Sequence, residues 1–189
     1  MRGRSSGHTR GSRLSPNDRE GPVLHPFDNQ ELHMDAATFA AVYIALYVAH
    51  SVGDHWVQTS CQSADKGKPG WTGRLAGARH VATLTATKVA LLLPVAALLG
   101  LRLSMLGLVA GLGVDALTHW WADRRSTLAW LAKVTGKAEF YSLGTGAHAA
   151  HPVTSEGKPA AHLGTGAYAL DQSFHHLWLL VAALLITTV

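Results

Sequence analysis

The chain has 189 residues, of which 48% are hydrophobic and only 15% are charged. Soluble domains carry about 25% charged residues, so this composition is unusually poor in charge, and the length allows one domain. The formal net charge is +4, and the single cysteine, Cys61, excludes an internal disulfide and a thiolate metal cluster within one chain.

Residues 1–35 are polar and contain five arginines among glycine, serine and proline. Such a segment cannot bury a core, so we predict a disordered basic tail. It also lacks the continuous apolar stretch of a secretory signal. A nucleic-acid-binding arm is the sharper interpretation, but the tail has no interleaved aromatic residues, so we expect no nucleic-acid partner.

Four apolar runs follow, at residues 36–57, 80–101, 103–122 and 170–189. A membrane-spanning helix needs about 20 mostly apolar residues. One such run could be a buried helix of a soluble protein, but four in a short chain predict a membrane domain over residues 36–189. We therefore predict an all-α fold, an up-down bundle of four helices that crosses the cell membrane and is surrounded by its lipid.

The connections between the runs differ in length. Residues 59–79 contain Gly67, Pro69 and Gly70, which are expected to break helix continuity. Residues 124–169 form a long loop, in which residues 126–137 have the pattern of a short amphipathic helix lying on the membrane surface. The loop also holds three histidines that we expect to be solvated, His148, His151 and His162.

Three of the runs carry a histidine and a carboxylate one helical turn apart. The sets are His50, Asp54 and Gln58, then Asp115, His119 and Asp123, then Asp171 and His175. Residues four apart lie above one another on a helix, so each set predicts a polar stripe. An ionisable group inside a bilayer costs about 2.5–3.5 kcal/mol, so these stripes are expected to face the interior of the bundle and to pair.

In an up-down bundle the stripes meet on one side of the membrane, where His80 begins the second run. Histidine plus carboxylate is the usual ligand set for zinc, manganese or iron, so a divalent metal site is predicted there. The candidate ligands are His50, Asp54, His80, His119, Asp123, Asp171 and His175. The candidate supporting residues are Gln58, Lys66, Asp115 and Gln172.

Several functions fit such a site. A metal-dependent hydrolase would use Asp54 or Asp171 as the catalytic base for a metal-activated water. A non-enzymatic module could bind or pass a cation, which Lys88 would oppose if it faced the site. The side chains could instead form a structural polar layer without metal, or the chain could be a regulator that binds unidentified protein partners through its basic tail.

Together the motifs resemble those of a bacterial family of multi-span membrane proteins known as domain of unknown function 3307. The family pattern is H-x-x-x-D-x-x-x-Q-T followed by a lysine, a lone H, H-x-x-x-D, and D-Q-x-x-H. This chain matches it with His50, Asp54, Gln58, Thr59, Lys66, His80, His119, Asp123, Asp171, Gln172 and His175. The resemblance covers about residues 40–185 and implies the membrane architecture and the shared site, but no particular reaction.

Two further features concern this chain alone. Family members often have a lysine soon after the second H-x-x-x-D, where this chain has Arg124 and Arg125. Its use of alanine, glycine and arginine is typical of a high-GC genome, such as that of an actinobacterium or its phage.

Basic residues are retained on the cytoplasmic side, so their excess near the stripes predicts that the site side is cytoplasmic. Those near the stripes are Lys66, Lys68, Arg74, Arg79, Arg124, Arg125, Lys133, Lys137 and Lys158, against Arg19 and Arg102 on the other side.

Overall fold

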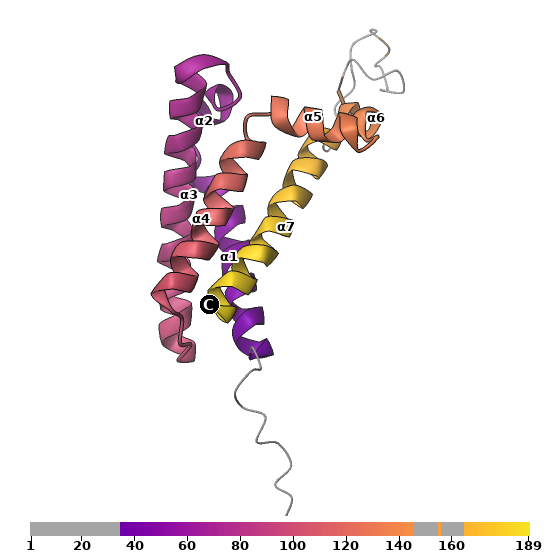
Figure 1. Ribbon diagram of the computed structural model, residues 1–189. Coiled ribbons are helices and arrows are strands. Elements are labelled where there is room, and N and C mark those ends of the chain that lie inside the picture. The colour runs from indigo at the N-terminus through magenta and orange to yellow at the C-terminus, as the bar shows by residue number, and fades with distance from the viewer. Residues whose placement is uncertain (1–34, 146–154, 156–164) are drawn as a thin grey trace, which may run out of the picture. The chain divides into compact units, whose positions relative to one another are not determined.

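A computed structural model describes residues 35–145, 155 and 165–189 (Figure 1). These residues are helical and contain no strand, so the all-α prediction is confirmed for this part of the chain. Residues 1–34 of the predicted tail lie outside the described residues, as do the three loop histidines.

The longer helices are α1 (Ala36–Val52), α3 (Gly70–Leu99), α4 (Met105–Ala122) and α7 (Gly166–Thr188). A single π-helical turn, η1 (Gly53–Val57), continues α1. The shorter helices are α2 (Ser60–Asp65), α5 (Ser126–Val134) and α6 (Ala138–Ser142). The short helix expected at residues 126–137 is therefore present as α5, in which Leu128 is buried at 5% exposure and Trp130 is 58% exposed.

Three helical segments are long and apolar enough to cross a membrane: residues 36–57, which are α1 with η1, and the helices α3 and α7. The third predicted run forms α4, which is not among these candidates in the described part of the chain. It is an 18-residue helix that carries Asp115 and His119. A fourth span remains a prediction.

The ends of the helices are specified by local capping. Asp35, Ser104 and Thr165 accept hydrogen bonds from backbone N–H groups in the first turns of α1, α4 and α7. Thr59 and Gln62 form a capping box at the start of α2. These bonds satisfy N–H groups that have no partner within their own helix.

The expectation for the 59–79 connector is wrong in its second half, because α3 begins at Gly70. Pro69 lies just before the helix in an extended conformation, where its missing N–H leaves no helical hydrogen bond unmade, so it starts α3 instead of breaking it. The helix ends at Gly100, whose φ of 66° gives the left-handed C-cap that glycine favours. As a result His80 lies within α3 and not at its start.

The helices pack around a core of aliphatic side chains, with α4 lying along α7 and α1 contacting both α3 and α7. The buried core residues include Val42, Leu46, Leu92, Leu179, Ala183 and Ile186. Large apolar side chains also cover the outer surface, among them Ile44, Leu98, Met105 and Leu117, which are 60–85% exposed. An apolar outer surface over helices of spanning length suits a lipid environment.

Candidate metal centre

The predicted polar stripes converge on one buried set of side chains drawn from α1, η1, α3, α4 and α7. We call this set the His/Asp cluster; its members are His50, Asp54, His80, His119, Asp123, Asp171 and His175. Asp171 has a side chain that is 25% exposed, whereas no other member exceeds 8%. The cluster therefore has a closed interior and one open edge, which lies at Asp171.

The first predicted stripe, His50, Asp54 and Gln58, is present only as far as Asp54. Nε2 of His50 lies 3.5 Å from Oδ2 of Asp54, four residues on. At Gly53 the helix widens into the π turn, and the N–H of Gln58 donates to the carbonyl of Gly53. Because this turn changes the register, Gln58 leaves the helix and the stripe ends at Asp54. Nε2 of Gln58 is buried without a hydrogen-bond partner among the described residues.

His80 lies at the centre of the cluster. Its Nε2 lies 3.1 Å from Oδ1 of Asp54 and 3.4 Å from Oδ2 of Asp123. The same nitrogen lies 3.0 Å from Nε2 of His119. One ring nitrogen offers at most one hydrogen, which cannot point at all three atoms. At most one of these three contacts can therefore use a hydrogen from His80.

The helices α4 and α7 complete the cluster. Nε2 of His119 lies 3.3 Å from Oδ2 of Asp123 and 3.6 Å from Oδ1 of Asp54. The ring of His175 stacks on that of His119, with a centroid distance of 3.9 Å. Nε2 of His175 also lies 3.5 Å from Oδ1 of Asp171. Imidazole groups from all four longer helices, α1, α3, α4 and α7, thus share one small volume.

The predicted supporting residues have different surroundings. Lys66 forms an ion pair with Asp123, with Nζ and Oδ1 2.7 Å apart. The side-chain amide of Gln172 donates to Oδ2 of Asp171 at 3.3 Å. Asp115 lies one turn from His119 on α4 and pairs instead with Lys88, at 2.5 Å between Nζ and Oδ2.

Lys88 and the two arginines after Asp123 have roles that the sequence did not reveal. The Arg124 guanidinium donates to the carbonyls of Lys66 and Lys68 at 2.9 and 2.6 Å, and Arg125 donates to the carbonyl of Ser63 at 2.9 Å. These bonds hold α2 and the segment after it against the end of α4. The signal for Lys88 was present, because a lysine in an apolar run requires a buried partner.

Many polar atoms of the cluster lack a hydrogen-bond partner among the described residues. They are Nδ1 and Nε2 of His50, Oδ1 of Asp54, Nδ1 of His80, Nδ1 of His119, Oδ2 of Asp123 and Nε2 of His175. A buried polar atom without a partner costs about 1–3 kcal/mol. So many in one place indicate a missing partner for the cluster and not a packing fault at any one residue.

The cluster offers metal ligands in three overlapping groups, each with its ligand atoms within 4.8 Å of one another. The groups are His50, Asp54 and His119; His80, His119 and Asp123; and Asp123, Asp171 and His175. Imidazole nitrogen and carboxylate oxygen together suit zinc, manganese and iron. The residues therefore fit a divalent metal ion.

Not every carboxylate in or beside the cluster has a cationic partner. Four carboxylates lie here, at Asp54, Asp115, Asp123 and Asp171. Two ammonium groups lie beside them, at Lys66 and Lys88. Lys66 pairs with Asp123 and Lys88 with Asp115, so Asp54 and Asp171 have no lysine or arginine partner among the described residues.

Comparisons of the chain with protein-family models, with curated proteins and with solved structures find no match. The function of the His/Asp cluster is therefore inferred from its own geometry and charge.

Proposed function

We propose that this chain is a membrane protein that holds a divalent metal ion in the His/Asp cluster and uses it for hydrolysis. The observation that carries the proposal is the set of buried nitrogen and oxygen atoms of the cluster that have no hydrogen-bond partner among the described residues. Asp54 and Asp171, which have no lysine or arginine partner among the described residues, support it, because a divalent cation would satisfy the unpaired atoms and these two charges together.

The members of the cluster divide into ligands and a base. Asp54 lies within 3.6 Å of His50, His80 and His119 and is 8% exposed, so its place is that of a ligand. Asp171 lies at the open edge, where water and a substrate can reach it, and Gln172 orients its carboxylate. We assign Asp171 as the general base and the buried members as ligands.

A divalent ion supplies Lewis-acid chemistry and makes water nucleophilic near neutral pH. In the hydrolysis the water oxygen forms a bond to the acyl or phosphoryl centre, and the bond from that centre to the leaving oxygen breaks. Asp171 accepts the proton that the water loses and passes it to the leaving oxygen. Lys66 holds Asp123 in place through their ion pair.

The proposal predicts that the protein purified in detergent carries about one zinc, manganese or iron ion per chain. His119 takes part in two of the three ligand groups, so His119→Ala is expected to lose most of that metal. The measurement is elemental analysis by mass spectrometry. Asp171→Asn is expected to keep the metal and to slow hydrolysis of a panel of chromogenic esters and phosphoesters by about 100-fold or more.

A matched control for this experiment is His55→Ala. His55 is an exposed histidine near the cluster that instead contacts the Ser51 carbonyl and the Tyr168 hydroxyl. It should keep the full metal content, because its ring belongs to none of the ligand groups. A folded parent protein that is free of metal after purification without chelators would overturn the proposal.

We further propose that the four longer helices form an up-down bundle in the cell membrane, with α4 as the fourth span. Its packing along α7 and its outward apolar residues, including Val109 and Leu117 at 66% and 71% exposed, support this. The resemblance to domain of unknown function 3307 is part of the same proposal, because that family has the same order of motifs.

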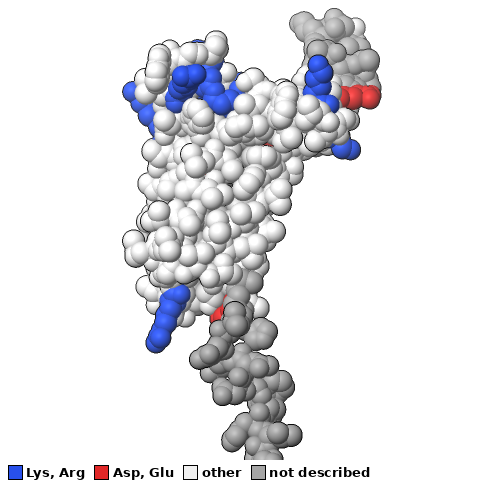
Figure 2. Space-filling model, in the orientation of Figure 1, with Lys and Arg blue, Asp and Glu red and all other residues white. Residues whose placement is uncertain are grey.

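Orientation gives a separate prediction. Lysine and arginine gather at the end of the described unit that holds α2, the start of α3 and α5 (Figure 1 and Figure 2). Arg102 lies between the end of α3 and the start of α4, and so at the opposite end of α3. Basic residues favour the cytoplasm, so the end with α2 is expected inside the cell. Cys61 in α2 is exposed and should resist a membrane-impermeant thiol reagent in intact cells, and react after permeabilisation.

The control for orientation uses a cysteine at the other end. Arg102 is exposed, so Arg102→Cys in a Cys61→Ser background should be labelled in intact cells. The reverse pattern, with Cys61 labelled from outside, would show that the cluster faces the cell exterior.

The alternative is a structural polar layer without metal, and one set of contacts favours it. Lys66–Asp123 and the hydrogen bond between His80 and His119 already join helices to each other. This interpretation predicts that alanine variants of the cluster lower only thermal stability. Cation passage is disfavoured, because Lys88 is fully buried and places a positive charge beside Asp115, one turn from the cluster.

A further inference from the structure

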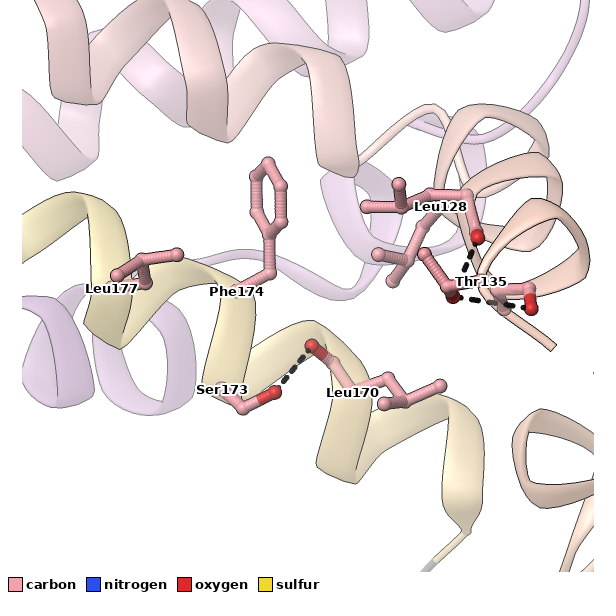
Figure 3. Close-up of a pocket in the computed structure, with 8 residues that line it drawn as sticks. Leu128, Thr135, Leu170, Ser173, Phe174 and Leu177 are labelled. Atoms are coloured by element: carbon pink, nitrogen blue, oxygen red, sulfur yellow. Dashed lines mark hydrogen bonds between the residues drawn. The ribbon is translucent and has the colours of Figure 1, made fainter. Parts of the chain in front are cut away.

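An apolar groove runs between α5 and α7 and continues onto α4. One part is lined by residues that include Leu128, Leu131, Leu170, Phe174 and Leu177 (Figure 3). The adjoining part shares Leu131 and Phe174 and adds Leu117, Trp121, Trp130 and Trp178. We call these two parts together the α5–α7 groove. Its lining is almost entirely apolar, and it lies outside the His/Asp cluster.

The groove and the open edge of the cluster lie next to each other on α7. Leu170 precedes Asp171, and Phe174 precedes His175 in the chain. The Phe174 ring stacks on Trp121 at 5.5 Å and lies 6.1 Å from the His175 ring. Successive residues of a helix point about 100° apart, so the groove and the Asp171 carboxylate lie on adjoining faces of α7.

We propose that the α5–α7 groove binds an acyl chain of an anionic glycerophospholipid whose headgroup lies at the His/Asp cluster. This rests on the proposed hydrolase function and names its substrate class. The groove opens outward, since Leu117, Trp130 and Leu177 are 71%, 58% and 57% exposed. On a chain with helices of membrane-spanning length, the neighbour at such a surface is lipid.

The position of the groove and the basic residues near it indicate which class of lipid it binds. Three tryptophans line it, and tryptophan is enriched at the boundary between acyl chains and headgroups. The linkages of a glycerophospholipid lie at this boundary. Exposed lysines in and after α5, Lys133 and Lys137, attract an anionic headgroup, as does the excess of basic residues at this end of the described unit.

The test uses the full chain in phosphatidylcholine vesicles that contain a small share of phosphatidylglycerol with a photoactivatable diazirine in its acyl chain. After illumination, mass spectrometry of peptides locates the label. We expect it to concentrate on residues 128–135 and 170–178. Excess unlabelled phosphatidylglycerol should displace it, and excess unlabelled phosphatidylcholine should not.

Two variants make the test specific. Ser173 is an exposed residue that lines the groove, so Ser173→Trp fills the groove without disturbing the core. It should lower the labelling about tenfold, which corresponds to about 1.4 kcal/mol of binding free energy. Val109→Trp is the matched control, because Val109 is 66% exposed and lines a separate apolar pocket between α3 and α4. It should leave the labelling unchanged.

The outcomes separate this inference from the proposed hydrolase. Label spread evenly over the apolar surface, or unchanged in Ser173→Trp, would leave only ordinary surrounding lipid and overturn the inference. Equal displacement by both lipids would also overturn it. In parent protein stripped with a chelator, labelling should remain on the same residues, since the acyl chain contacts no cluster residue. Unlabelled phosphatidylglycerol should then compete less well, because the metal-free carboxylates repel its headgroup. If the protein is labelled specifically but never binds metal, the lipid-site inference would stand and the hydrolase proposal would fail.

Discussion

Replacement of Asp115 by alanine is expected to lower the free energy of unfolding by about 3–5 kcal/mol. Lys88 is fully buried and its ammonium lies 2.5 Å from Oδ2 of Asp115. Without that carboxylate, Asp115→Ala leaves an uncompensated charge in an apolar interior, and that penalty is the reason for the large effect. The measurement is unfolding of the purified protein by a denaturing detergent titrated against a mild one.

Two controls test whether the loss of stability comes from the burial of the Lys88–Asp115 ion pair or from the removal of any charge. Asp65 and Lys68 form a pair of similar length, 2.6 Å, with side chains 30% and 57% exposed, so Asp65→Ala should cost less than about 1 kcal/mol. The double change Lys88→Met with Asp115→Leu should recover most of the lost stability, because it removes both charges. If Asp115→Ala and Asp65→Ala cost the same, Lys88 must reach water or another anion.

Replacement of Gly111 by leucine is expected to separate α4 from α7. A Cβ at Gly111 would lie 2.6 Å from the carbonyl oxygen of Ala182 and 2.6 Å from Cγ1 of Ile186. Overpacking a tight contact costs about 1–3 kcal/mol or more, and here the obstacle is backbone that cannot rotate away. Close approach at small residues is also the usual way in which membrane helices associate.

The effect of Gly111→Leu should also reach the cluster. The helix α4 carries His119 and Asp123, and α7 carries Asp171 and His175, so a shift between these helices separates ligands. Both the unfolding temperature, followed by circular dichroism, and the metal content should fall. Gly113→Leu is the matched control on the same helix, since a Cβ there meets nothing within 4 Å. Equal losses in both variants would mean that helix contact at Gly111 is not the cause.

The sequence by itself determined that the described part of the chain is helical, and it supplied the candidate residues for the cluster. Runs of apolar residues predicted helices near those observed, because continuous hydrophobicity over about 20 residues leaves few alternatives. A spacing of four residues was enough to select His50, Asp54, His119, Asp123, Asp171 and His175, because on a helix that spacing fixes the face. The start of α3 was missed, since Pro69 and Gly70 begin a helix by the same properties that usually end one.

Only the tertiary structure decided which polar residues pair with one another and which enter the cluster. Asp115 and His119 share a face of α4, yet the first pairs with Lys88 and the second enters the cluster, because α3 presents lysine at one level and His80 at another. The π turn that removes Gln58 from its stripe begins at Gly53, where an added Cβ would collide with the side chain of Leu84 in α3. The α5–α7 groove joins residues more than 30 positions apart, and local spacing carries no information about such contacts.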